Sequence, residues 1–317
     1  MNSQIKLAII AIVIVIPLAS FAVTQPSFNS EISTTKNSKL QVITSATFLY
    51  EFSQNIGKEM IDVTLLVPMG ADPHDWEPTI RDREKWQKAD VIIVNGIGYE
   101  HWLDSFDSND NQGILVDTSN GISTLDSEKH DDHTKEDDHD GHEEDKHNHG
   151  DLDPHIWLNP VYAQLQVKNI ANALSNSDPT NKNYYQSNAA IYNKELDLLD
   201  SKIRTELSGC KTDFITFHNA FSYFSGEYGL TQHTIISSND SHGEVTPQTL
   251  ENIISLAREL NIKVIFAEES TSTKTSQVIA DEIDGKVLVL SPLEIVSDES
   301  YVEKMTQNLD SLKDALC

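Results

Sequence analysis

A histidine-rich acidic run over residues 129–150, KHDDHTKEDDHDGHEEDKHNHG, is the feature that most constrains how this chain folds. The run has no apolar side chain to bury, and its carboxylates repel one another. Nothing would therefore offset the entropy lost on ordering it, and a packed core cannot include it. We expect residues 127–151 to form a disordered loop that interrupts the globular part of the chain.

The same run is rich in metal-binding groups. Neutral imidazoles are the commonest side-chain ligands of Zn²⁺ and similar ions, and dense carboxylates raise the local concentration of cations. The run is either an auxiliary low-affinity metal loop, which we favour, or an acidic solubilising linker whose histidines are incidental. The loop ligands would be His130, His133, His139, His142, His147 and His149.

The N-terminal segment indicates the compartment. Residues 7–23 are almost wholly apolar, and Ser20 and Ala22 are small residues suited to a cleavage site. Residues 1–22 are therefore a signal peptide or, because the run is nearly long enough to span a bilayer, an N-terminal anchor. No cysteine follows the run directly, so we do not expect a lipoprotein anchor. Residues 23–39 predict a flexible tether, and the remainder is expected outside the cytoplasm, secreted or anchored to the outer face of the cytoplasmic membrane.

Charge and cysteine content narrow the class of protein. The formal net charge is −27 and the pI is near 4.6, which argues against nucleic acid and anionic membrane surfaces as partners. Two cysteines are too few for a disulfide scaffold. Whether Cys210 and Cys317 pair is left open, because their spacing in the sequence does not give their distance in space.

Short apolar runs alternate with helical patterns in two sets, which predicts an α/β fold of two (βα)4-like sandwich lobes with parallel sheets. Residues 40–182, including the His-rich loop, would form the N-terminal lobe, and residues 209–317 would form the C-terminal lobe. The strands are expected at residues 41–44, 62–67, 91–94 and 113–117, and at 213–217, 234–236, 264–267 and 287–290. Helices are expected at residues 46–56, 79–88, 220–228, 247–260, 274–284 and 301–316.

The segment between the two sets lacks Gly and Pro. Apolar positions such as Ala190, Leu196 and Ile203 recur in it at helical spacing. Residues 183–208 therefore predict one long helix that joins the lobes, and such a rigid connector would limit hinge motion between them. The alternative is an ordinary core helix of one lobe.

Four residues are candidates for metal ligands at the ends of predicted strands or beside the acidic loop: His74, His155, His218 and Glu294. In α/β sheets, ligands bind beyond the carboxyl ends of the strands. Each residue alone is a weak signal, because a histidine at a strand end is more often a surface or hydrogen-bonded residue. Two candidates come from each lobe, which predicts a metal site in the interlobe cleft.

Two of the histidines share a local frame. His74 and His155 each stand in Asp-Pro-His with a Trp two residues further on, at residues 72–76 and 153–157. Proline fixes one backbone torsion, and a stiff loop loses less entropy when it binds a ligand. Three imidazoles and one carboxylate suit a tetrahedral Zn²⁺ site.

Several motifs, in this order, resemble the zinc/manganese solute-binding proteins of ABC importers: GADPHDWEPT, NGIGYEHWLD, a His-rich acidic insertion, DPHIWLNP, FHNAFSYFSGEYGL, FAEES and SPLE. The resemblance covers residues 40–316. Matched motif by motif, it implies that the metal ligands are His74, His155, His218 and Glu294. It also implies a monomer that works with a membrane-embedded ABC permease and, through it, a cytoplasmic ATPase. Departures at residues 243–247 and at Ser291 fall outside the matched ligand positions.

Ligand chemistry favours Zn²⁺ as the cargo over Mn²⁺, which would more usually take two carboxylates. Four protein ligands leave no position for an activated water, so the site suits capture and delivery rather than hydrolysis. We therefore predict a high-affinity zinc-binding protein of an ABC-type metal importer. The alternatives are a manganese-binding homologue, and a secreted metal buffer or adhesin without a transporter.

The enzymatic alternative is a secreted zinc hydrolase. Such an enzyme would need a general base beside the metal, for which Glu268 and Glu269 are candidates. The sequence has neither a His-Glu-x-x-His helix nor a Gly-x-Ser-x-Gly elbow. We predict that the chain is not an enzyme.

The remaining histidines and two tryptophans have simpler interpretations. His101 and His233 are expected to be structural, and His242 lies in a polar loop and is left out of the site. Trp76 and Trp157 either form an apolar shell around the metal or pack in the core, and we favour packing.

Overall fold

The computed structural model describes residues 39–68, 71, 75–106, 113–125, 152–236, 245–269, 273–295 and 298–317. The predicted signal or anchor, the predicted tether up to residue 38 and the His-rich run lie outside these residues, and so does His242. In the described part, no helix has both the length and the apolar character that crossing a membrane requires.

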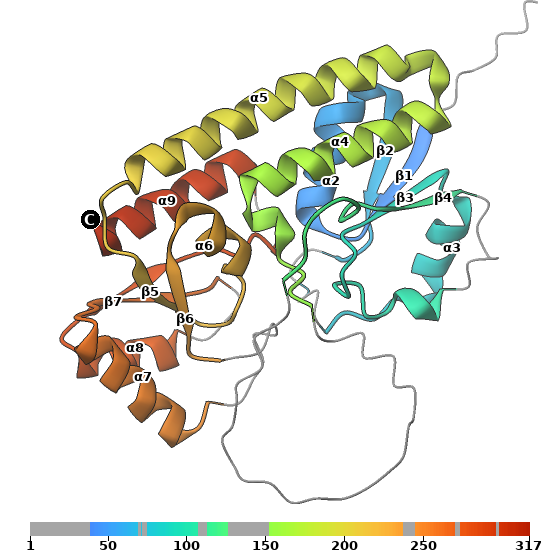
Figure 1. Cartoon of the computed structure of the whole chain (residues 1–317). Coiled ribbons are helices and arrows are strands. Elements are labelled where there is room, and N and C mark those ends of the chain that lie inside the picture. The colour runs from blue at the N-terminus through green and yellow to red at the C-terminus, as the bar shows by residue number, and fades with distance from the viewer. Residues whose placement is uncertain are drawn as a thin grey trace, which may run out of the picture. The chain divides into compact units, whose positions relative to one another are not determined.

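The N-terminal lobe is built on a parallel sheet whose described strands lie in the order β2-β1-β3-β4 (Figure 1). The central strand β3 has four consecutive apolar residues, all buried, as expected for a parallel sheet covered on both faces. The elements are β1 (Leu40–Thr44), α2 (Thr47–Gly57), η1 (Lys58–Met60), β2 (Ile61–Leu65), α3 (Ile80–Lys88), β3 (Val91–Val94), η2 (Leu103–Ser105) and β4 (Ile114–Asp117).

The C-terminal lobe repeats this topology. Its described strands are also parallel and lie in the order β6-β5-β7-β8, so in both lobes the first strand in sequence lies between the second and the third. The elements are β5 (Asp213–Thr216), α6 (Ser222–Tyr228), β6 (Thr231–Thr234), α7 (Pro247–Glu259), β7 (Val264–Ala267), α8 (Lys274–Glu282), β8 (Lys286–Val289) and α9 (Tyr301–Leu316).

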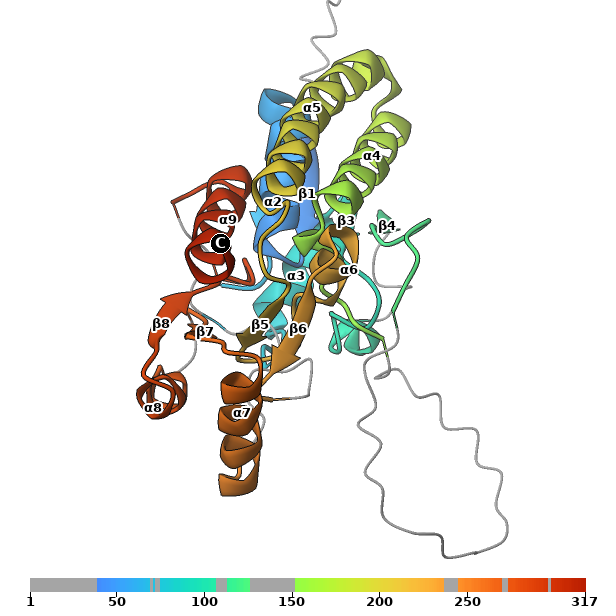
Figure 2. The same cartoon turned by 60° about the vertical axis from the view of Figure 1, so that its left-hand side comes forward.

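Two long helices follow the strands of the N-terminal lobe and pack against each other, and the second of them joins the lobes (Figures 1 and 2). Helix α4 (Pro160–Ser177) follows η3 (Ile156–Leu158) and begins where the Asn159 side chain accepts a hydrogen bond from the Val161 amide. After η4 (Pro179–Asn181), helix α5 (Lys182–Glu206) runs for 25 residues. It contacts α2 and α4 of the N-terminal lobe and, near its C-terminal end, α9 of the C-terminal lobe (Figure 1).

The hydrophobic core explains the role of α5. One buried cluster is continuous through both lobes and α5, with members such as Phe48, Trp157, Leu196, Phe214 and Leu309. Two further clusters cover the other faces of the two sheets, one in each lobe. Because α5 is part of the shared core, it is packed along its length and opposes independent movement of the lobes.

The predicted fold class is confirmed: two parallel α/β lobes are joined by one long helix. One strand was placed wrongly, because the prediction put it at residues 234–236 and β6 lies at Thr231–Thr234. Ile235 and Ile236 follow it and are buried, and each donates one backbone hydrogen bond, to Thr216 and Phe217 respectively. The two isoleucines therefore indicated burial correctly. The edge strand β6, which pairs with β5, has the polar sequence TQHT. Helix α4 was not predicted as a separate element.

Candidate metal centre

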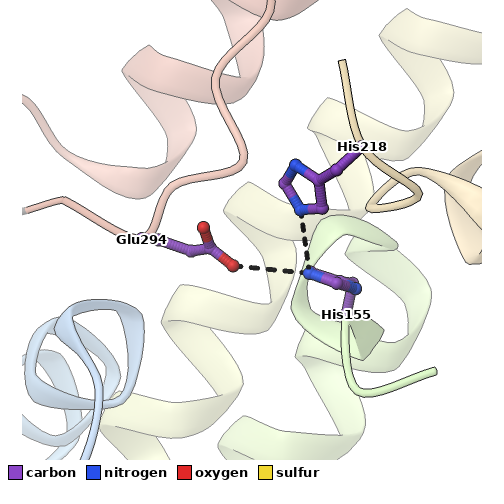
Figure 3. Close-up of side chains that lie close together, drawn as sticks. All are labelled: His155, His218 and Glu294. Carbon is purple, nitrogen blue, oxygen red and sulfur yellow. Dashed lines mark hydrogen bonds and ion pairs between the residues drawn. The ribbon is translucent and has the colours of Figure 1, made fainter. Parts of the chain in front are cut away.

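Three of the four predicted ligands meet between the lobes (Figure 3). His155 Nε2 lies 3.4 Å from His218 Nε2 and 3.4 Å from Glu294 Oε1. All three side chains are buried, and the exposed fraction is 0% for both histidines. Among the described residues, this is the one group of three or more His, Cys, Asp or Glu side chains whose donor atoms converge in this way.

His155 is held by its own turn. Asp153 Oδ1 accepts hydrogen bonds from the His155 amide at 3.0 Å and from Nδ1 at 2.8 Å. Asn95, which follows β3, donates from Nδ2 to the Pro154 carbonyl at 2.9 Å, and Tyr223 donates to the Asp153 carbonyl at 2.8 Å. The Asp-Pro-His frame therefore carries both the candidate ligand and the group that orients it.

His218 is held by a residue that is distant in sequence. It follows β5, and Glu268 follows the neighbouring strand β7. Glu268 Oε1 accepts from the His218 amide at 3.1 Å and from Nδ1 at 2.6 Å. The two strands are paired, so the sheet brings the acid and the histidine together.

These acids fix which nitrogen of each ring is available. A carboxylate on Nδ1 takes that N–H as a donor and leaves the lone pair on Nε2, which is the usual arrangement of a metal-ligating histidine. Both Nε2 atoms face the same space as Glu294 (Figure 3). In a tetrahedral site with bonds of about 2.0–2.2 Å, ligand atoms are about 3.3–3.6 Å apart. The two distances of 3.4 Å match this spacing.

The charge of the cluster also suits a cation. Asp153, Glu268 and Glu294 are all buried beside the two imidazoles. Asp153 Oδ2 and Glu268 Oε2 have no hydrogen-bond partner among the described residues. Buried carboxylates are costly unless their charge is compensated, and a divalent ion between the rings would supply that compensation.

Protonation of His155 competes with metal binding. Burial alone lowers its pKa, but hydrogen bonds from the ring to Asp153 and Glu294 outweigh burial and raise the pKa to about 9. In the absence of metal, a proton on His155 thus compensates part of the negative charge of Asp153 and Glu294. Metal binding must displace it.

Glu294 lies on the segment between β8 and α9. The preceding Leu293 is buried and has a positive φ of 60°, in the left-handed region that non-glycine residues seldom adopt. Ser291 Oγ accepts from the Leu293 amide at 3.2 Å. This local conformation aims the carboxylate at His155.

The other predicted residues are placed as follows. His74 and the six loop histidines lie outside the described residues. His101 is exposed beside Glu77, and His233 is hydrogen-bonded to Asp213 at 2.9 Å; neither belongs to the convergent cluster. The orienting roles of Asp153 and Glu268 were missed, although Asp153 stands in the quoted frame and Glu268 had been weighed as a catalytic base.

Both tryptophans pack in cores. Trp76 meets Trp102 edge to face at 5.0 Å between ring centroids, in the cluster of the N-terminal lobe. Trp157 stacks on Phe48 at 4.4 Å and also lies 5.1 Å from the His155 ring. Packing therefore describes Trp76, while Trp157 contributes both to the core and to the wall beside His155.

Comparison with known proteins identifies the family. Residues 42–315 match the family model of ZnuA, the periplasmic component A of the zinc-uptake complex. The chain belongs to this family. It is 40% identical over 292 residues to the high-affinity zinc uptake system protein ZnuA of Bacillus subtilis (strain 168), covering 89% of each chain.

Solved structures share the fold of this chain. The metal-dependent lipoprotein YcdH of Bacillus subtilis is 37% identical, with a TM-score of 0.73 over 88% of this chain and 99% of that chain. A crystal structure of ZnuA is 30% identical, with a TM-score of 0.75 over 88% of this chain and 100% of that chain. Membership of the ZnuA family confirms the predicted class, a solute-binding protein of an importer and not an enzyme.

Proposed function

We propose that this chain captures one Zn²⁺ between its lobes through His155, His218 and Glu294, with His74 as the fourth ligand, and delivers it to an ABC permease. The observation that carries the proposal is the convergence of two imidazole Nε2 atoms and one carboxylate oxygen at the spacing of a tetrahedral zinc site. Membership of a zinc-uptake family supports the same cargo.

The donor set favours zinc over manganese. Two described ligands are imidazoles and one is a carboxylate, and His74 would add a third imidazole. Manganese prefers a larger share of hard oxygen ligands. The acids that bond Nδ1 of each ring also make the imidazoles better donors and hold them in the orientation that the metal requires.

The family places the protein outside the cytoplasm, as a component that works with ABC transporter partners. Within that frame, we propose that residues 1–22 direct export and are either cleaved or kept as an anchor. The chain would act as a monomer that docks on a membrane permease driven by a cytoplasmic ATPase. The His-rich run would collect zinc weakly near the site.

The test is a zinc titration against a competing chelator, on the full chain and on a variant that lacks residues 129–150. We expect deletion to remove weak binding events and to keep one tight site. In either background, His155→Ala or His218→Ala should weaken the tight site by more than about a hundredfold, since even loss of an orienting partner costs about 10–100-fold. His233→Ala, which removes a surface histidine, is the matched control.

Three outcomes would contradict the proposal. Unchanged zinc affinity in His155→Ala would show that the described cluster is not the tight site. Loss of tight binding on deletion of residues 129–150 would show that loop histidines belong to the primary site. Native mass spectrometry of protein purified from its source would report the bound metal and its stoichiometry. Manganese in place of zinc would show that zinc is the wrong cargo.

A further inference from the structure

The segment that carries Glu294, residues 291–295, is anchored by the C-terminal lobe at its start. Asn308 of α9 accepts from the Ser291 amide at 2.8 Å and donates to the Ser291 carbonyl at 2.7 Å. The Ser291 hydroxyl donates to Glu269 at 3.0 Å, and Lys304 of α9 pairs with the other oxygen of Glu269. Glu269 therefore has a structural contact here and faces Ser291 rather than the metal cluster.

The next two residues are held by the N-terminal lobe instead. Trp157 Nε1 donates to the Pro292 carbonyl at 2.8 Å, and Thr47 Oγ1, at the start of α2, donates to the Leu293 carbonyl at 3.0 Å. Both donors lie far from their acceptors in sequence, by 135 and 246 residues respectively. A ligand of one lobe is thus held from the other lobe immediately before its own position.

The backbone of Leu293 needs such support. Its φ of 60° places a leucine in the left-handed region, where the Cβ of a non-glycine residue crowds the following carbonyl oxygen. A strained conformation persists only where surrounding contacts fix it. Two hydrogen bonds are contacts of this kind: the Leu293 amide donates to Ser291 Oγ, and the Leu293 carbonyl accepts from Thr47 Oγ1.

Residues 291–294 are buried, but the segment borders open space on one side. A cavity of about 690 Å³ lies against it, and its lining includes Thr47, Leu293 and Ile295 together with residues at the start of α9. Space on this side gives the segment room to move if its hydrogen bonds are lost. The hydrogen bonds therefore help to fix where the Glu294 carboxylate lies relative to His155.

We propose that Thr47 and Trp157 are positioning residues that hold Glu294 in the zinc-binding geometry from across the lobe boundary. The inference rests on the proposed function, because it takes Glu294 as a zinc ligand. Preorganised ligands lose less entropy on binding, so loss of either hydrogen bond should lower zinc affinity without removing a ligand. The C-terminal lobe would then offer its carboxylate fully only while it is docked on the N-terminal lobe.

Thr47 gives the cleaner test, because Trp157 also touches the His155 ring. We would measure zinc affinity by chelator competition for Thr47→Val, which keeps the shape and removes the hydroxyl, and for Thr47→Ser, which keeps the donor. Thr47→Val should weaken binding by about threefold to tenfold, the value of one neutral hydrogen bond, and Thr47→Ser should bind like the unaltered chain. Thr64→Val, on the same cavity wall, is the matched control and should have no effect.

The same substitution in a Glu294→Gln background separates positioning from general structure. If Thr47 acts through Glu294, then Thr47→Val should weaken zinc binding in the native background and add nothing in Glu294→Gln. An equal loss in both backgrounds, or no loss in the native background, would overturn the positioning role. Trp157→Phe, which keeps an aromatic ring against Phe48 and removes the donor, should follow the same pattern.

The two proposals fail in different ways. If Glu294→Gln binds zinc as tightly as the native chain, the ligand assignment fails, and the positioning role fails with it. If Glu294→Gln weakens binding while Thr47→Val and Trp157→Phe do not, the ligand assignment stands and only the positioning role is wrong. Thermal unfolding of each metal-free variant shows whether that variant is folded. If Thr47→Val is not folded, the comparison of Thr47→Ser with the native chain still tests the hydroxyl.

Discussion

The two lobes have the same strand order but use it differently at the point where that order reverses. In the C-terminal lobe, the crevice beyond β5 and β7 holds His218 and its acid Glu268. In the N-terminal lobe, the corresponding crevice beyond β1 and β3 holds a buried carboxylate, Glu100, which accepts hydrogen bonds from Ser45 at 2.5 Å and the Asn95 amide at 2.7 Å. At this point the C-terminal lobe has a candidate ligand, His218, and the N-terminal lobe has a buried structural carboxylate, Glu100.

Glu100 is nevertheless linked to the candidate metal site. Asn95, whose amide bonds Glu100, donates through its side chain to the Pro154 carbonyl beside His155. In the N-terminal lobe, the candidate ligand His155 therefore lies on the connection after β4 and is held by Asn95, which follows β3. In the C-terminal lobe, the candidate ligand His218 itself follows the central strand β5. The shared topology provides equivalent positions, and the loops decide which of them carry chemistry.

The largest expected effect concerns a covalent difference between the lobes. Cys210, just after α5, is bonded to Cys317, so that the bridge closes the C-terminal lobe across 107 residues with a Cα–Cα distance of 4.7 Å. The sequence has no other cysteine, so the N-terminal lobe has no such bridge. A double Cys→Ser variant should lose about 4 kcal/mol of stability, because its unfolded chain regains the entropy of a long open loop.

Urea unfolding of the metal-free protein, with the reduced native chain as control, measures this loss. Zinc affinity should change little, because Asn308 holds the Glu294 segment from α9 well before the bridged end of that helix. Equal stability with and without the bridge would show that the C-terminal lobe does not depend on it. A large loss of zinc affinity would show that the bridge sets the position of Glu294.

The next effect compares the two acids that orient the histidines. Asp153→Asn and Glu268→Gln should each weaken zinc binding by about 10–100-fold, because an amide cannot accept from Nδ1 as strongly and does not hold the ring in the required tautomer. Chelator competition measures both. Equal losses would mean that a local turn and a paired strand position their histidines equally well, whereas no loss in one variant would show that its ring is held by packing alone.

This pair also shows where sequence reasoning succeeds and where it stops. The alternation of apolar strands and amphipathic helices was enough to predict two parallel lobes and the long helix, because burial and periodicity are local properties of a sequence. The Asp-Pro-His frame pointed to His155, and its own Asp153 was available in the same frame. A reader of the sequence alone could have assigned that acid.

Glu268 could not be assigned in this way. It lies 50 residues after His218, and only the pairing of β5 with β7 brings the two together. The bonds from Thr47 and Trp157 to the Glu294 segment are hidden for the same reason, since they cross the lobe boundary. Sequence patterns indicate which residues are buried or rigid, but contacts between distant segments follow from register and docking, which no local pattern encodes.

The last prediction concerns Glu100, the buried carboxylate of the N-terminal lobe. Burial raises the pKa of Glu100 to about 7, although hydrogen bonds from Ser45, Asn95 and Gly96 oppose the rise. Because the folded pKa lies above the usual value of 4.5, the stability that protonated Glu100 contributes is fully present below pH 4.5 and is lost as the pH rises through 7.

The stability of the metal-free native chain relative to Glu100→Gln should therefore fall by about 3 kcal/mol between pH of about 4.5 and about 8, since one pKa unit corresponds to about 1.4 kcal/mol. The difference between the two proteins isolates Glu100, because every other titrating group, including His155, is present in both. Urea unfolding at several pH values gives the curve. A difference that stays constant over this range would mean that Glu100 remains charged at this buried position, held by its hydrogen bonds.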